Sequence, residues 1–235
     1  MKVEIWSDVV CPWCYIGKRR FESALEHFEH SDEVEVRWCS YELDPNAPLR
    51  RSKSVAENLA AKYGTTVEEA ASRLEQLDRL AEKDGLSYDL ARTQGGNTFT
   101  AHRLIHLGYQ KDPRMGAALK EALLHAYFIE HQPISDPTVL LEIGTEAGLD
   151  PDEVSRLIDG DRFAEEVRQD EAEAAALGCT GVPFFVIDRA FAVPGAQDSD
   201  TFLAVLRRAW ERSHPNLERI DLAGDGSCDD GSCSL

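Results

Sequence analysis

The sequence predicts an α/β fold in which an all-helical insertion separates a βαβ half from a ββα half. Residues 1–48 read as strand, helix and strand, residues 49–160 contain only helical patterns, and residues 161–213 read as helix, two strands and helix. Strands that return after a long helical block indicate one sheet completed by both ends of the chain. Residues 214–235 are predicted to form a tail.

The first half begins with a strand, because Lys2 to Trp6 alternate polar and apolar residues. A helix follows, since its apolar residues recur at i, i+3, i+4 and i+7, which places on one face Phe21, Ala24, Leu25 and Phe28. Val34 to Tyr41 reads as the second strand. This order predicts a parallel strand pair joined by a right-handed crossover.

The insertion is predicted to be a series of helices near residues 54–63, 66–83, 98–108, 114–130, 137–147 and 151–158. Thr66 and Glu69 form a capping-box pattern at the start of the second. Two later helices begin with an aspartate followed by proline, at Asp136 and Asp150. These start signals support an insertion without strands.

The second half is predicted to contain strands at Pro183 to Ile187 and Arg189 to Val193, with a final helix near 199–212. The last residues are rich in Gly, Asp and Ser and include Cys228 and Cys233. Such a composition cannot bury a core, so a flexible acidic tail is expected.

The charge of −18, from 43 acidic and 25 basic residues, disfavours nucleic acid as a partner. The one basic cluster, Lys18-Arg19-Arg20, is interpreted as a solvated helix face. The sequence contains neither a secretory signal pattern nor a membrane-length apolar run, so no membrane contact and a cytoplasmic location are expected. Six cysteines there suggest catalysis, metal binding or burial rather than a disulfide framework.

Cys11-Pro12-Trp13-Cys14 lies where the first strand gives way to the first helix. Unsatisfied N–H groups and the positive end of the helix dipole favour a thiolate at that position, so Cys11 is the expected nucleophile. Pro12 suits the first helical position because its missing N–H costs nothing there. Cys14, one turn further and more buried, would then resolve the mixed disulfide.

Half of a zinc site is the alternative interpretation of this pair, because Cys-x-x-Cys also occurs in zinc knuckles. Closing such a site requires two further ligands, and the sequence has no second Cys-x-x-Cys. No metal is therefore expected, and dithiol chemistry is favoured.

Thr180-Gly-Val-Pro-Phe-Phe-Val places a proline at the opening of a strand. Together with the N-terminal Cys-Pro-x-Cys and the helical insertion, it resembles the DsbA-like branch of the thioredoxin superfamily. The resemblance implies a thioredoxin fold with the insertion between its two halves. It also implies a cis bond between Val182 and Pro183, and a role for both residues in binding the substrate chain beside the active-site sulfur.

The motif from Trp6 through the first helix, Tyr41-Glu-Leu-Asp-Pro, and Asn97-Thr-x-x-Ala-His-Arg-Leu together resemble the FrnE group of cytosolic dithiol–disulfide oxidoreductases. Some of its members carry a C-terminal Cys-x4-Cys, as Cys228 and Cys233 do here. Trp13 stands where strongly oxidising DsbA proteins have histidine, which implies a less oxidising couple.

The tail pair is hypothesised to relay oxidising equivalents to or from Cys11 and Cys14. About 15 flexible residues span on the order of 20 Å, enough to reach a site in the same domain, and tethering raises the effective concentration. The alternative is a tail whose thiols oxidise incidentally.

Three other residues near these motifs are assigned less definite roles. Cys39 is expected to be a small buried hydrophobic residue in the second strand. Cys179 precedes the Gly-Val-Pro turn and is not assigned a redox role. Asp8 either tunes Cys11 or caps the turn, and the sequence leaves both open.

The predicted function is that of a thiol–disulfide oxidoreductase and protein disulfide isomerase acting on protein thiols and disulfides. No cofactor is expected beyond glutathione as a redox partner, and a cellular thiol reductant or oxidant would complete the cycle. A glutathione-dependent isomerase or kappa-class transferase is the first alternative, although those enzymes have serine at the first position of the motif. A redox-linked chaperone is the second.

Overall fold

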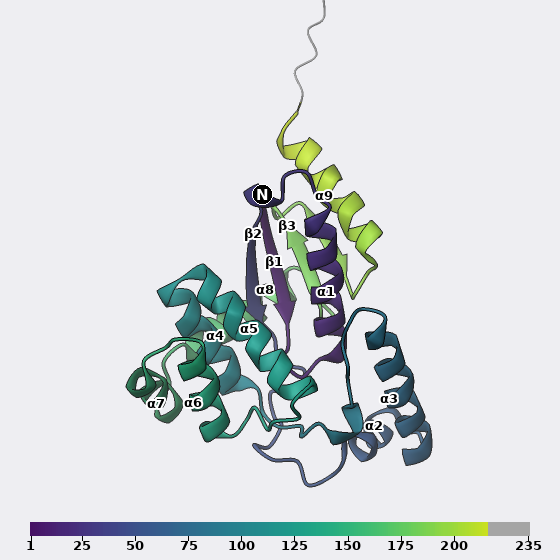
Figure 1. Cartoon of the computed structure of the whole chain (residues 1–235), viewed down its shortest axis with the longest axis vertical. Coiled ribbons are helices and arrows are strands. Elements are labelled where there is room, and N and C mark those ends of the chain that lie inside the picture. Colours follow the sequence, from purple (N-terminus) through teal and green to yellow (C-terminus); the bar gives the residue numbers. More distant parts are fainter. Residues whose placement is uncertain (216–235) are drawn as a thin grey trace, which may run out of the picture.

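The computed structural model describes residues 1–215, and in it both ends of the chain contribute to one four-stranded sheet (Figure 1). The strands are β1 (Lys2–Ser7), β2 (Glu35–Ser40), β3 (Phe184–Ile187) and β4 (Phe191–Pro194), in the order β2-β1-β3-β4. β1 and β2 are parallel, as predicted, whereas β3 runs antiparallel to β1 and to β4. The predicted α/β fold with a helical insertion is confirmed.

The two faces of the sheet follow from the alternation of side chains along β1. Val3 and Ile5 point to the face covered by α1 (Pro12–Glu26) and α9 (Ser199–Ser213), where they join one hydrophobic core. Trp6 points to the opposite face, which α8 (Ala164–Ala176) covers. In Figure 1, α1 and α9 lie in front of the sheet and α8 lies behind it.

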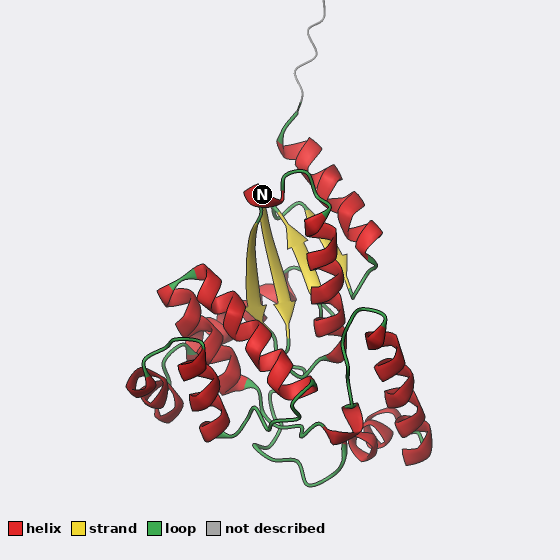
Figure 2. Cartoon of the chain, viewed as in Figure 1, coloured by secondary structure: helices red, strands yellow, loops and turns green. Residues whose placement is uncertain are grey.

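The insertion consists only of helices, short 3₁₀ turns and loops in the part of the chain described (Figure 2). Its helices are α2 (Val55–Tyr63), α3 (Val67–Glu82), α4 (Phe99–Lys111), α5 (Pro113–Phe128), α6 (Pro137–Glu146) and α7 (Pro151–Asp159). The capping box of Thr66 and Glu69 is present, and Asp136 and Asp150 cap α6 and α7. α2 and α3 lie apart from the α4–α7 group, on the other side of the active-site end of α1.

The second strand of the C-terminal half is shorter at its start than predicted. β4 begins at Phe191 rather than at Arg189, because Asp188 and Arg189 both have positive φ angles, 47° and 54°. That backbone makes the tight turn between β3 and β4 and cannot continue a strand.

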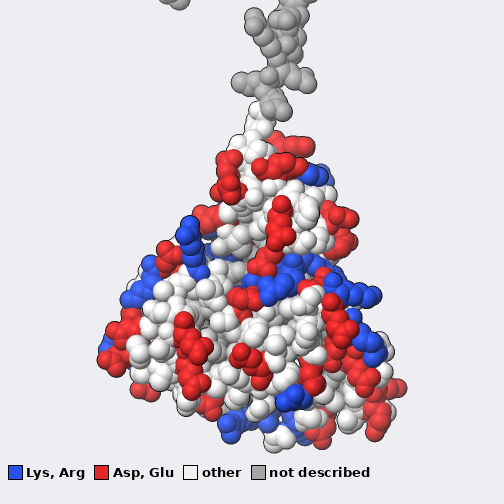
Figure 3. Space-filling model, in the orientation of Figure 1, with Lys and Arg blue, Asp and Glu red and all other residues white. Residues whose placement is uncertain are grey.

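The basic cluster on α1 is not a solvated face, which corrects the sequence-based interpretation. Lys18 is buried and pairs with Glu22 and with Glu121 of α5. Arg19 also pairs with Glu121, and Arg20 binds Asp84, which follows α3. The cluster therefore holds α1 to both groups of insertion helices, and Figure 3 shows blue side chains gathered over this middle zone between red ones.

No helix among residues 1–215 is both long enough and apolar enough to cross a membrane.

Candidate active site

The site forms where β1 ends and α1 begins. Cys11 is the N-cap residue of α1, with the extended backbone (φ −90°, ψ 113°) expected of that position, and Pro12 is the first helical residue. Cys14 lies one turn into the helix. The side chain of Cys11 is 4% exposed and that of Cys14 is fully buried, so only Cys11 faces outward at all.

The structure brings the Gly-Val-Pro loop to the first of these sulfurs. The Cys11 thiol donates a hydrogen bond to the carbonyl oxygen of Val182 at 3.6 Å. The Val182–Pro183 peptide bond is cis, as the sequence resemblance implied. Trp13, which is 42% exposed, lies on the outer side of the same helix turn.

Gly17 makes this close approach possible. A Cβ atom on Gly17 would lie 2.9 Å from Cγ of Pro183 and 3.3 Å from Cβ of Ala196. The absence of a side chain lets the loop before β3 lie directly on α1. Sequence reasoning passed over this glycine, since a helix-interior glycine close to a motif gives no distinct signal.

The two buried thiols shift each other's pKa in opposite directions. The hydrogen bond with Cys14 and burial raise the pKa of Cys11 well above that of an ordinary thiol. Burial alone would raise the pKa of Cys14, but the hydrogen bond from Cys11 and the charge of Lys120 outweigh burial and lower it. Burial and the neighbouring sulfur thus favour the protonated form of Cys11, while the charge of Lys120 favours the thiolate of Cys14.

For the closed pair the expected Cys11 thiolate stays a prediction, and two effects oppose it. The helix dipole acts on Cys11, but burial by the Val182 loop and the proximity of Cys14 act against it. Cys11 nevertheless remains the sulfur nearer to the surface. A proton transfer from Cys11 to Cys14 would generate the Cys11 thiolate, which is the nucleophile.

The insertion surrounds the other side of the pair with polar groups that sequence reasoning largely missed. The Tyr88 hydroxyl donates to the carbonyl oxygen of Pro12 at 3.0 Å. Asp8, 1% exposed, accepts from the Leu43 amide at 2.7 Å and lies 3.4 Å from Nε2 of His102. The Asp8 side chain therefore anchors Leu43 rather than capping the turn before α1, and its charge contributes to raising the pKa of Cys11.

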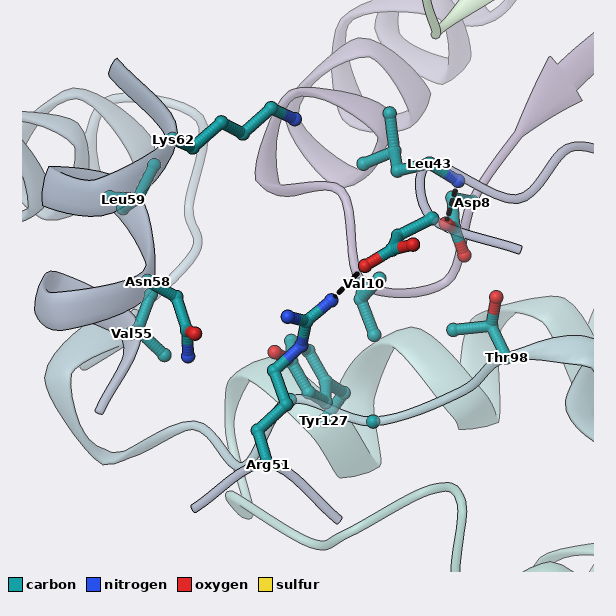
Figure 4. A pocket seen from close by; sticks show the side chains of 13 residues that line it. Asp8, Val10, Leu43, Arg51, Val55, Asn58, Leu59, Lys62, Thr98 and Tyr127 are labelled. Carbon is teal, nitrogen blue, oxygen red and sulfur yellow. Dashed lines mark hydrogen bonds and ion pairs between the residues drawn. The ribbon is translucent and has the colours of Figure 1, made fainter. Parts of the chain in front are cut away.

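A pocket of about 500 Å³ opens beside this loop (Figure 4). Its wall on the α2 side carries Lys62, whose amine points toward the cavity, and its floor includes Val10, the residue before Cys11. Arg51 at its rim pairs with Asp44. The pocket thus combines apolar walls with two basic and two acidic side chains, and it reaches Val10, next to the active-site motif.

Comparison with known proteins identifies the fold at family level. The family model for the DsbA-like thioredoxin domain matches residues 2–207. The chain belongs to the DsbA-like thioredoxin family. A probable DsbA oxidoreductase from Streptomyces coelicolor is 41% identical and matches with a TM-score of 0.86, over 100% of this chain and 99% of that one.

Two further matches are more distant. The uncharacterized protein YwbO of Bacillus subtilis is 25% identical over 201 residues, which is 85% of this chain and 92% of that protein. The cytosolic disulfide reductase DsbM from Pseudomonas aeruginosa, solved with GSH, has a TM-score of 0.57 at 20% identity, over 88% of this chain and 98% of that one. The latter likeness shows the shared fold only.

Of the remaining cysteines of this DsbA-like chain, two lie within the described residues and two lie outside them. Cys39 is buried in β2, and burial raises its pKa, which confirms its interpretation as a small hydrophobic residue. Cys179 is partly exposed and donates to the carbonyl oxygen of Gly181 at 3.3 Å. Cys228 and Cys233 lie outside the described residues. Within residues 1–215 no three His, Cys, Asp or Glu side chains are grouped so as to hold a metal.

Proposed function

We propose that the protein is a thiol–disulfide oxidoreductase that exchanges disulfides with protein substrates through Cys11 and Cys14. The observation that carries this proposal is the position of the outer sulfur. Cys11 caps α1 and contacts the Val182 carbonyl at 3.6 Å, while Cys14 is buried behind it. A substrate chain pairing with the backbone of Val182 would present its disulfide to Cys11, and Trp13 offers an exposed apolar contact beside it.

The exchange proceeds in two balanced steps. Once its proton has passed to Cys14, the Cys11 thiolate attacks a substrate disulfide, forms a mixed disulfide and releases one substrate thiolate, which takes a proton from water. Cys14 then loses its proton and attacks the Cys11 sulfur. The Cys11–Cys14 disulfide forms, the second substrate thiolate leaves, and two electrons have passed to the substrate. The reverse sequence oxidises a substrate dithiol.

A glutathione redox titration tests the couple, with differential alkylation and peptide mass mapping of all six cysteines. Reversible Cys11–Cys14 pairing at one definite potential is expected, together with loss of disulfide exchange in Cys11→Ser and in Cys14→Ser. Cys179→Ser is the matched control, because this cysteine is partly exposed and bonded to Gly181 rather than to the pair. If Cys11 only ever holds glutathione and never pairs with Cys14, the glutathione-dependent isomerase or transferase alternative replaces this proposal.

Isomerase activity and the tail relay are finer parts of the proposal. Refolding of scrambled ribonuclease separates isomerisation from simple oxidation. A Cys228→Ser, Cys233→Ser double variant with unchanged oxidase and isomerase turnover would remove the relay from the proposal. Membership of the FrnE group and the cytoplasmic location stay predictions.

Glutathione is the proposed small-molecule redox partner, and the pocket beside Val10 supports it. The pocket volume of about 500 Å³ is within the range of small-molecule sites. Lys62 provides a cation for a carboxylate close to the cysteine motif. We expect Lys62→Ala to slow exchange with glutathione but not with uncharged dithiothreitol. Lys53→Ala is the control, since Lys53 is exposed and does not line the pocket; equal slowing in both variants would argue against this binding mode.

A further inference from the structure

Lys120 of α5 is a fully buried lysine that the exchange steps above do not use. Its residue exposure is 1%, although a lysine is almost never buried without a charged partner. The side chain reaches from the helical insertion to the end of β1, where Nζ donates to the carbonyl oxygen of Ser7 at 3.1 Å. Nζ also lies 5.7 Å from the centre of the Trp38 ring.

The immediate surroundings of this amine contain no carboxylate partner. Among residues 1–215, no carboxylate oxygen lies within 4.0 Å of a Lys120 nitrogen. The nearest candidate, Asp8, is engaged by the Leu43 amide and by His102. One backbone carbonyl and one aromatic face are weak compensation for a desolvated ammonium.

The charged and titratable groups that act on Lys120 include both active-site sulfurs. Cys14 on α1 is the first of its negative neighbours, followed by Asp8 and Cys11 in the loop, and Lys18 on α1 is a positive one. Burial lowers the pKa of Lys120 to about 8, in spite of the support from Cys14 and Asp8. The amine therefore titrates close to the pH at which thiols exchange.

We propose that Lys120 is a positioning residue for the redox couple, whose buried ammonium stabilises the Cys14 thiolate that resolves the mixed disulfide. The proposal rests on the function proposed above. It assigns to the helical insertion a direct part in the redox step, since the lysine comes from α5 and the sulfurs come from α1.

The step balances without another reactant. Cys14, protonated after Cys11 has attacked, loses its proton to water or to a neutral Lys120 amine. The resulting thiolate attacks the Cys11 sulfur of the mixed disulfide, and the substrate thiolate leaves with the electron pair of the broken S–S bond. The ammonium favours the reduced couple with its thiolate over the uncharged disulfide.

Lys120→Met tests the proposal, because methionine keeps the length and apolar stem of the side chain and removes the charge. Reduced protein is mixed with glutathione disulfide, quenched in acid, alkylated and mapped by mass spectrometry. We expect resolution of glutathionylated Cys11 at pH 7 to slow about threefold for each unit by which the Cys14 pKa rises, since a tenfold smaller thiolate fraction is partly offset by higher nucleophilicity. The glutathione equilibrium should move toward the disulfide, because the thiolate of the reduced protein loses the ammonium; each tenfold change in that equilibrium corresponds to about 30 mV.

Lys18→Met is the matched control, since it removes a lysine of comparable burial whose amine is already paired with Glu22 and Glu121. Because the charge of Lys18 lowers the pKa of Lys120, its removal favours the Lys120 ammonium, so resolution should not slow and the equilibrium should not move toward the disulfide. Wild-type behaviour of Lys120→Met in both measurements would overturn the proposal.

A measurement on the wild-type protein tests the role of Lys120 even if the Lys120→Met variant fails to fold. The Lys120 side chain is titrated by ¹³Cε NMR in the oxidised and in the reduced protein. Linkage requires its pKa to be higher in the reduced state if its charge stabilises the thiolate. Identical titrations in the two states would reject the proposal.

Failure of the proposed function can be distinguished from failure of the Lys120 proposal. If the wild-type protein never forms a Cys11–Cys14 disulfide in glutathione buffers, the dithiol couple itself is wrong. If it forms the disulfide but the two Lys120 measurements show no effect, only the role of Lys120 is wrong.

Discussion

The two sides of the cysteine pair are built from different parts of the chain and from different chemistry. On the side of the Val182 loop, the groups that meet Cys11 and α1 are a backbone carbonyl, a proline ring and a glycine without a side chain. On the side of the insertion, the loop carboxylate of Asp8 meets an imidazole, the first turn of α1 meets a hydroxyl, and the end of β1 meets an ammonium. The first side presents a backbone carbonyl to a substrate chain, and the second is built around buried polar and charged side chains.

This difference assigns substrate recognition to the Val182 side and adjustment of the redox properties of the cysteines to the insertion side. Backbone and apolar contacts bind any extended chain and carry little charge, so they suit varied protein substrates. Buried charges act strongly on a nearby sulfur because water does not screen them. Variants on the two sides should therefore fail in different ways.

The largest effect is expected for Asp8→Ala on the insertion side. It leaves the Leu43 amide and His102 without their buried acceptor, which should lower the free energy of unfolding by roughly 3 kcal/mol. Chemical denaturation at pH 7 measures this loss. Asp44→Ala is the control, because its ion pair with Arg51 is exposed and should contribute less than about 1 kcal/mol.

The same variant predicts a pH dependence with a definite sign. Burial alone would raise the pKa of Asp8, but His102, the Leu43 amide and Lys120 hold it below its ordinary value. The stabilisation is therefore complete above the unfolded pKa of about 4 and is lost as pH falls through the lower folded pKa. The stability difference between wild type and Asp8→Ala should shrink only below about pH 4. A difference that already shrinks near pH 6 would contradict this account.

The next effect is expected for Gly17→Ala on the Val182 side. The new methyl group meets Pro183 at 2.9 Å, and overpacking of this kind costs about 1–3 kcal/mol, of which better helix propensity restores about 1. The displaced loop should also slow disulfide exchange while the Cys11–Cys14 potential stays near that of wild type. Gly181→Ala, with no atom within 4 Å of the added methyl, is the stability control. A changed Cys11–Cys14 potential with an unchanged rate of disulfide exchange would instead assign the redox adjustment to the Val182 side.

Local sequence patterns were sufficient to predict most of the fold and the position of the cysteine pair. The helix caps at Thr66 and Asp136, the strand alternation of β1 and the cysteine spacing each depend on neighbours in the sequence. The strand β4 was placed too early because the paired positive φ angles of Asp188 and Arg189 have no distinct sequence signature.

Long-range contacts account for what the sequence did not predict. Lysine is the kind of residue expected at exposed helix positions, yet Lys18 and Lys120 are both buried, by elements about a hundred residues away in the sequence. The Cys11 thiol likewise donates to the carbonyl oxygen of Val182, 171 residues further on. A faint signal existed for Lys120, since Leu119 precedes it and Leu123 and Leu124 follow it in the sequence.

The smallest effect is expected for Tyr88→Phe, which removes one hydrogen bond from the insertion side and keeps the ring. Phenylalanine can still stack on Phe128, whose ring centre lies 4.8 Å away, so only the contact to the Pro12 carbonyl is lost. We expect a loss of about 1 kcal/mol in thermal or chemical unfolding. Tyr63→Phe, at an exposed position, should change nothing measurable. Because the hydroxyl contacts the first turn of α1 and neither sulfur, the Cys11–Cys14 potential should stay constant; a shift of that potential would place Tyr88 beside Lys120 among the groups that tune the couple.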